Sequence, residues 1–114
     1  MTPLPEDQVE ELKSYCSEVL VGEEAGKVYL LLRDLQLPQG CQPATCDALL
    51  CPTERDGYPS RLFFDQVLPA MKSRNLNANG LRILERDWYA VSWKLSRPNL
   101  RLAEMVLGHL RALV

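Results

Sequence analysis

The sequence predicts an α+β domain in which an N-terminal helix is followed by a four-stranded antiparallel meander and a C-terminal helix. Near both ends of the chain apolar residues recur at helical spacing, and between them short apolar segments alternate with turn residues. The length of 114 residues suits one core and is too short for two ordinary domains. We therefore expect residues 1–114 to form a single domain.

The first predicted helix begins just after Pro5, where acidic residues supply the negative charge that a helix N-terminus favours. Gly22 is a natural stop for this helix. The apolar positions recur at helical spacing and are Val9, Leu12, Cys16, Val19 and Leu20. This spacing predicts one helix that continues to about residue 20.

Four extended segments are expected in the middle of the chain, and they cover residues 27–35, 44–51, 61–68 and 81–95. A turn with Pro38 and Gly40 follows the first segment. A polar loop with Pro52, Gly57 and Pro59 separates the second segment from the third. Because short turns join antiparallel neighbours, these segments predict the meander.

The C-terminal helix is predicted by one apolar stripe, with Pro98 near its start. The stripe consists of Leu102, Met105, Val106, His109, Leu110 and Leu113. A lone histidine on such a stripe is more often a packed residue than a catalyst. We therefore interpret His109 as part of the core or its boundary.

Charge is polarised along the chain, although the formal net charge is only -2. Residues 1–26 hold seven acidic residues and one lysine, whereas residues 60–114 hold nine basic and four acidic residues. The basic residues are spread rather than clustered, so we expect a solvated face and no nucleic-acid partner. No apolar run approaches the ~20 residues of a membrane-spanning helix, and the acidic start is unlike a signal peptide. We therefore expect a cytoplasmic protein that does not contact membranes.

The chain contains four cysteines, namely Cys16, Cys41, Cys46 and Cys51. Their spacing matches none of the paired Cys-x-x-Cys arrangements that mark zinc sites, and the only histidine is distant in sequence. Reduced, packed thiols are therefore expected, with no metal. The chain also lacks a Gly-rich phosphate loop and the common hydrolase motifs, so no cofactor is expected.

Two local sequences resemble the ubiquitin-conjugating enzyme superfamily. Residues 58–64, YPSRLFF, are similar to the Tyr-Pro step that leads into the third strand of these enzymes. Residues 75–85, NLNANGLRILE, look like the segment that runs from the asparagine of the His-Pro-Asn motif to just past the catalytic cysteine. Trp88 and Ser92 also match a Trp-x-x-x-Ser element of prokaryotic conjugating-enzyme family E, the branch that looks closest.

This resemblance implies a UBC-like fold and, as partners, a ubiquitin-like protein and an adenylating activating enzyme. Active members hold the modifier as a thioester on a cysteine, with the asparagine amide near the oxyanion. Asn75 matches that asparagine, whereas Ile83 occupies the position of the cysteine. An isoleucine side chain cannot carry an acyl group, so the usual catalytic cysteine is missing.

Three interpretations of the function follow. In the first, the chain is a ubiquitin-conjugating-enzyme-like protein of a bacterial modification pathway that binds the modifier, its activating enzyme or both without a thioester. In the second, it is a ubiquitin-like modifier transferase with another nucleophile, either Ser92 or Cys51. In the third, it is an unrelated α+β protein-interaction module. The candidate site residues are accordingly Asn75, Ser92 and Cys51.

Overall fold

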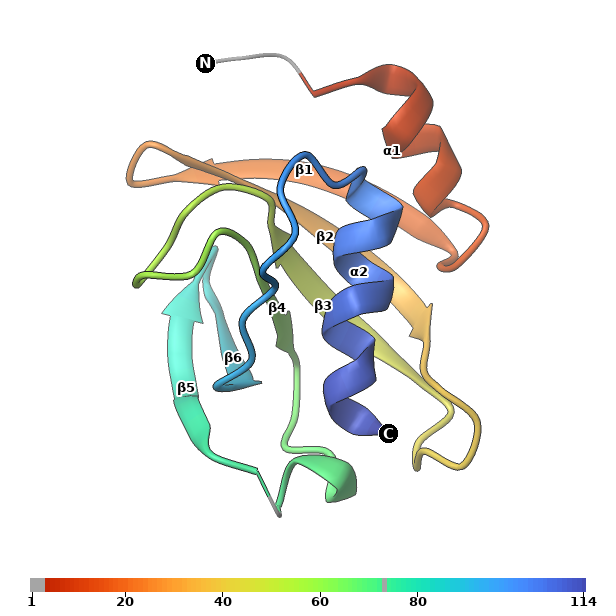
Figure 1. Cartoon of the computed structure of the whole chain (residues 1–114), viewed down its shortest axis with the longest axis vertical. Coiled ribbons are helices and arrows are strands. Elements are labelled where there is room, and N and C mark those ends of the chain that lie inside the picture. Colours follow the sequence, from red (N-terminus) through yellow and green to blue (C-terminus); the bar gives the residue numbers. More distant parts are fainter. Residues whose placement is uncertain (1–3, 73) are drawn as a thin grey trace.

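The structure, a computed structural model, describes residues 4–72 and 74–114. Within these residues the chain forms one six-stranded antiparallel sheet with the strand order β1-β2-β3-β4-β6-β5 (Figure 1). The strands are β1 (Glu18–Glu24), β2 (Lys27–Gln36), β3 (Thr45–Cys51), β4 (Arg61–Phe64), β5 (Leu76–Ile83) and β6 (Arg86–Val91). The helices are α1 (Glu6–Leu12) and α2 (Leu102–Leu110), with short 3-10 turns at Pro69–Met71 and Arg111–Leu113.

The prediction of a UBC-like four-stranded meander between two helices is wrong, because the chain forms a larger sheet with two short helices. One of the additional strands is β1, which replaces the second half of the predicted first helix. Ala25 and Gly26 form a two-residue turn with φ of 53° and 79°, and this turn folds β1 back onto β2. Strand pairing with β2 therefore overrides the helical spacing of the apolar residues after Leu12.

The other additional strand is β5, because the predicted fourth segment, residues 81–95, holds only the last three residues of β5 together with all of β6, and these two strands pair as a hairpin. Leu84 and Glu85 make its turn with φ of 50° and 66°. Neither residue is one that a turn of this kind favours, so the turn is not apparent from the local residues. β4 pairs with β6 and not with β5, so β5 lies at the edge of the sheet.

The helices cover one face of the sheet and pack against each other near their N-terminal ends (Figure 1). Arg101 makes ion pairs with Asp7 and Glu11, at 3.1 and 3.2 Å. Most of the α2 stripe is buried as the sequence predicts, with Met105 half-buried and His109 only 5% exposed. These contacts enclose the larger of two hydrophobic cores.

A second hydrophobic core lies on the other face of the sheet, where no helix covers it. The sheet curls, so that the turn of the β5–β6 hairpin reaches β1: the backbone N–H of Leu84 donates to Glu24 Oε1 at 3.0 Å. Gly22 of β1 allows this approach, since a Cβ atom there would lie 3.0 Å from Leu84. The residues enclosed are Tyr29, Leu49, Cys51, Phe63, Ala78, Ile83, Trp88 and Ala90. Both faces of the central strands therefore carry buried residues, whereas β1 has none.

No helix in the described part of the chain is long and apolar enough to cross a membrane.

Candidate functional site

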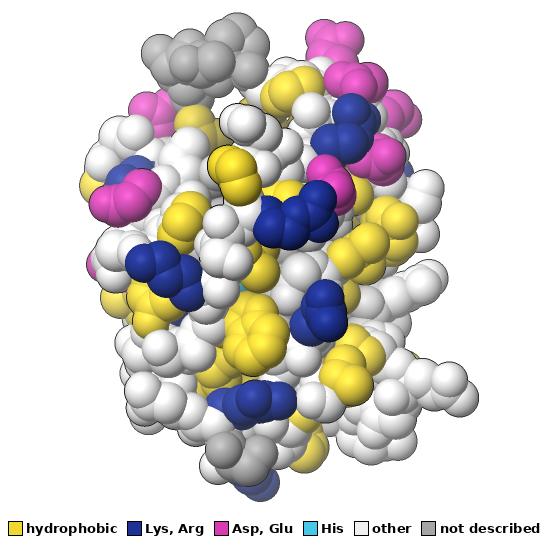
Figure 2. Space-filling view, in the orientation of Figure 1, with side chains coloured by type: hydrophobic (Ala, Val, Ile, Leu, Met, Phe, Trp, Pro, Cys, Tyr) yellow, Lys and Arg dark blue, Asp and Glu magenta, His cyan; other side chains and the backbone are white. Residues whose placement is uncertain are grey.

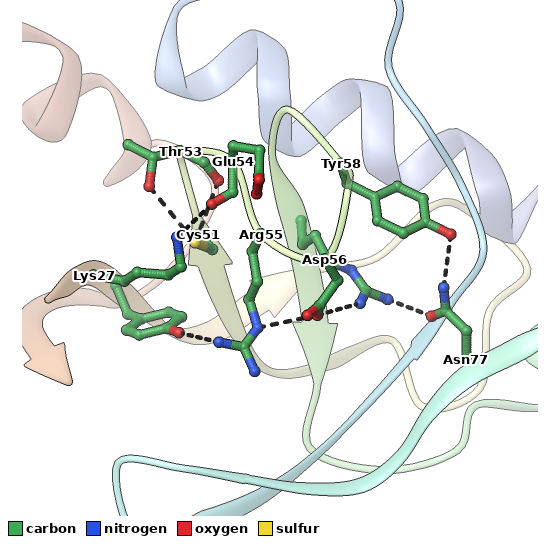
Figure 3. A network of polar contacts seen from close by, with 10 residues as sticks. Lys27, Cys51, Thr53, Glu54, Arg55, Asp56, Tyr58 and Asn77 are labelled. Carbon is green, nitrogen blue, oxygen red and sulfur yellow. Dashed lines mark hydrogen bonds and ion pairs between the residues drawn. The ribbon is translucent and has the colours of Figure 1, made fainter. Parts of the chain in front are cut away.

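A network of polar side chains connects the loop before β4 to the β5–β6 hairpin (Figure 3). Its centre is Arg61, the first residue of β4, which is only 4% exposed. The guanidinium donates to Asp56 Oδ2 at 3.2 Å and to Asn77 Oδ1. It also stacks over the rings of Tyr58 and Phe63, at 4.7 and 4.9 Å from the ring centres. A buried arginine is thus held by an ion pair, a hydrogen bond and two aromatic faces.

The network continues from Arg61 to an exposed hydroxyl. Since a guanidinium can only donate hydrogen bonds, the contact with Arg61 fixes the oxygen of the Asn77 amide toward it. The amide nitrogen of Asn77 then donates to the Tyr58 hydroxyl at 2.7 Å. Tyr58 Oη in turn lies 2.7 Å from the Oγ of Ser92, which is exposed. The arrangement places a phenol oxygen, already receiving one donor, where it can accept the serine proton.

The structure brings two of the three candidate residues together. Asn75 and Ser92 lie just before β5 and just after β6, where the Ser92 N–H donates to the Asn75 carbonyl oxygen at 2.7 Å. Both residues are exposed. This contact joins the two backbones. Of the two side chains, that of Ser92 is the one that belongs to the polar network.

The third candidate, Cys51, lies apart from this pair. It is 0% exposed in the second core, and its Sγ contacts the carbonyl oxygen of Thr53 at 3.5 Å. Figure 3 shows it near Lys27 at one end of the view, while Tyr58 and Asn77 lie at the other. A nucleophile must reach its substrate, and the Cys51 thiol is closed off from solvent.

The other thiols give no indication of a reactive site. Cys16 and Cys46 are buried, and Cys41 is half-buried. Burial raises the pKa of Cys46 to about 12 and also raises the pKa of Cys16. Both shifts disfavour the thiolate that a transfer reaction needs. Ile83, the residue at the position of the usual cysteine, is itself 1% exposed inside the second core.

A buried Ser–His pair lies between β4 and α2. Ser60 Oγ is 3.0 Å from His109 Nε2, and the two residues are 3% and 5% exposed. Burial, with a smaller contribution from Arg61, lowers the pKa of His109 to about 4, so the imidazole is neutral near pH 7. A substrate cannot reach either side chain, and the pair therefore joins the sheet to α2 rather than forming a catalytic dyad.

Sequence reasoning missed Arg61 and Asn77 as site residues. Asn77 belongs to the segment that resembles a conjugating site, and it lies in β5 with its side chain in the network. Arg61 belongs to the Tyr-Pro-Ser-Arg segment, but only the fold shows that its side chain is buried. Alternation along β5 could have placed the side chains of Leu76 and Asn77 on opposite faces, if the strand itself had been predicted.

The chemistry available at this site is that of an exposed hydroxyl with a phenol acceptor. In the described residues no group of three or more His, Cys, Asp or Glu side chains could hold a metal ion. A search for similar proteins found no matching family model, curated protein or solved structure. The function is therefore inferred from the residues of this chain and their geometry.

Proposed function

We propose that this chain is a protein-binding component of a bacterial ubiquitin-like modification pathway and carries no thioester of its own. Its partners would be the modifier, the adenylating activating enzyme or both. The support is local, since the six-stranded sheet differs from the conjugating fold. It consists of the resemblance of residues 58–64 and 75–85, which supply Tyr58, Arg61 and Asn77 to one network.

The burial of thiols supports the second part of this proposal, namely that the chain carries no thioester of its own. A thioester carrier needs an exposed cysteine with an accessible thiolate. Cys16, Cys46 and Cys51 are at most 8% exposed, Cys41 is half-buried, and Ile83 fills the position where the carrier would stand. The burial of three of the four thiols supports a role through contacts rather than through a thioester.

The test is to incubate the chain with the modifier, the activating enzyme and ATP, and to measure its intact mass without reductant. We expect a complex on size-exclusion chromatography and no adduct that thiols release. A thiol-labile adduct would contradict the proposal, and so would the absence of any complex. The variant Asn77→Ala, which breaks the contact with Tyr58, tests whether the network shapes the binding surface.

A second function is favoured by the Ser92–Tyr58 contact, namely transfer of the modifier through an oxyester on Ser92. The serine oxygen would attack the thioester carbonyl on the activating enzyme, forming a C–O bond as the C–S bond breaks. The serine proton would pass through the Tyr58 hydroxyl to the departing thiolate, so that atoms and charge balance. The 2.7 Å contact and the exposure of Ser92 support this step.

This alternative predicts an adduct that resists thiols but is cleaved by hydroxylamine. Ser92→Ala should abolish the adduct, and Ser92→Cys should convert it into one that thiols release. Tyr58→Phe keeps the ring over Arg61 but removes the hydroxyl, so adduct formation should slow while the complex persists. An unchanged adduct in Ser92→Ala would exclude Ser92 as the acceptor.

A further inference from the structure

A groove of about 700 Å³ lies between α2 and the segment that leads into it, residues 93–100. This segment runs beside α2 (Figure 1) and begins directly after Ser92. The volume falls within the ~300–1,000 Å³ typical of ligand clefts. None of the lining residues belongs to the polar network described above.

The floor of the groove is apolar and fixed to α2. Trp93 donates its indole N–H to the carbonyl oxygen of Gly108 at 3.1 Å. Gly108 lets Leu95 lie directly on the helix, because an added Cβ atom would come within 3.1 Å of the leucine side chain. Leu107, the neighbour of Gly108 on α2, lines the groove and is 43% exposed. Exposed leucine and tryptophan surfaces of this kind gain free energy when a partner covers them.

The rim of the groove is basic. Lys94, Arg97 and Arg111 are exposed, and in the described part of the chain none of the three makes an ion pair. Figure 2 shows Lys and Arg side chains among hydrophobic ones on this face, while acidic side chains gather toward α1. These cations are thus available to an anionic partner.

The other charged residues of the groove are already engaged. Glu104, the acidic residue of the lining, accepts the backbone N–H of Arg101 at 2.8 Å and so caps the start of α2. Arg74 donates to the backbone oxygen of Val114 at 3.1 Å and lies over the Trp93 ring. The groove therefore presents three free positive charges around an apolar floor.

We propose that this groove binds an extended peptide segment of a partner protein in which acidic and apolar residues alternate. In an extended chain successive side chains point to opposite sides, so one set can cover the leucines and Trp93 while the other meets the cations. Charge complementarity selects the acidic class of peptide. The inference concerns this groove alone and holds whatever pathway the chain serves.

The test uses a fluorescein-labelled octapeptide of alternating leucine and aspartate, titrated with the full chain and followed by fluorescence anisotropy. We expect saturable binding that weakens as salt is raised, because exposed charges are screened. A peptide of alternating leucine and lysine should not bind. Absence of binding by the acidic peptide, or equal binding of both peptides, would overturn the proposal.

Charge-reversal variants test whether the acidic peptide binds at this groove. Lys94→Glu combined with Arg97→Glu should weaken binding by about tenfold or more, since two of the three rim charges change sign. The matched control combines Arg33→Glu on β2 with Arg82→Glu on β5. Both arginines are exposed, the charge change is the same, and neither residue lines the groove. Equal losses in the two double variants would mean that net charge rather than the groove drives binding.

A floor variant and two competitors complete the test. Gly108→Ala should displace Leu95 and reduce affinity while circular dichroism shows the fold retained. A single-stranded oligonucleotide and a phosphatidylserine vesicle are added as competitors at equal charge concentration. Displacement of the peptide by either at lower concentration than unlabelled peptide would overturn the assignment to a peptide partner.

Discussion

Among the described residues, Arg61 is the one buried side chain of the Asp, Glu, Lys and Arg types. It is 4% exposed, yet its charge is balanced by Asp56 and its hydrogen-bonding capacity is used by Asn77. A buried charge is costly unless it is paired and hydrogen-bonded, and here both conditions are met. Arg61 also orients Asn77 and, through it, Tyr58, so the geometry at Ser92 depends on a residue that does not touch it.

Arg61→Met is expected to lower the free energy of unfolding by about 2–4 kcal/mol, because it removes the ion pair, the amide contact and two ring contacts together. Urea denaturation measures this loss. The matched control is Arg82→Met, which breaks the exposed 3.2 Å ion pair with Asp87 and should cost less than about 1 kcal/mol. Equal losses in the two variants would contradict the structural role given to Arg61.

His109 should make stability depend on pH. Burial lowers the pKa of His109 in the folded chain to about 4 from the ordinary 6.5, so between these values the unfolded chain binds more protons than the folded chain. Stability is then fully present above pH 6.5 and falls as the pH drops toward 4, by about 3 kcal/mol in total. Denaturation at several pH values should show a shallower dependence in His109→Gln. Parallel curves for the two proteins would be inconsistent with a buried neutral imidazole.

At the scale of the elements, two hairpin turns determine the sheet. Both place two consecutive residues at positive φ, at Ala25–Gly26 and at Leu84–Glu85. Such turns match the twist of the strands they join, although alanine, leucine and glutamate adopt this backbone at a cost. The non-glycine residues there are strained by the strand pairing around them.

Ala25→Asn should therefore stabilise the protein, since asparagine adopts positive φ more readily than alanine. We expect a gain of about 0.5–1 kcal/mol, seen as a rise in the thermal midpoint. Ala25→Val is the opposing variant, because a β-branched residue at φ of 53° should lower the midpoint. A lower midpoint for the asparagine variant would argue against this turn.

At the scale of the whole molecule, the curled sheet decides which side chains a reagent can reach. Ile83 is enclosed because the β5–β6 hairpin turns toward β1, whereas Ser92 lies at the exposed exit of β6. Two positions that the resemblance singles out, Ile83 and Ser92, thus have opposite accessibility. This difference follows from the fold and not from local sequence.

Introducing a thiol at each position tests the fold directly. Ser92→Cys should react with a disulfide reagent about a hundredfold faster than Ile83→Cys, because a buried thiol reacts only when the structure opens. Peptide mass mapping separates these thiols from the four native cysteines. Faster labelling at position 83 than at position 92 would show that the hairpin does not close over the second core.

Much of the secondary structure was predictable, because it depends on local patterns. The strands at 27–35 and 44–51 and the apolar stripe of α2 are present as expected. The third strand is shorter than predicted, and the first helix ends at Leu12. The candidate site was only partly predictable, since Ser92 and Asn75 adjoin but the network that reaches Ser92 comes from Tyr58, Asn77 and Arg61.

The sequence by itself determined the C-terminal helix, two central strands, the polarised charge and the lack of a cysteine at position 83. Only the tertiary structure decided that residues 18–24 form a strand, that β6 pairs with β4, and that Arg61 is buried beside Tyr58. The physical reason is that periodicity and charge are properties of neighbouring residues. Strand pairing and the burial of a charge depend on residues far apart in the chain, which meet only when the sheet curls.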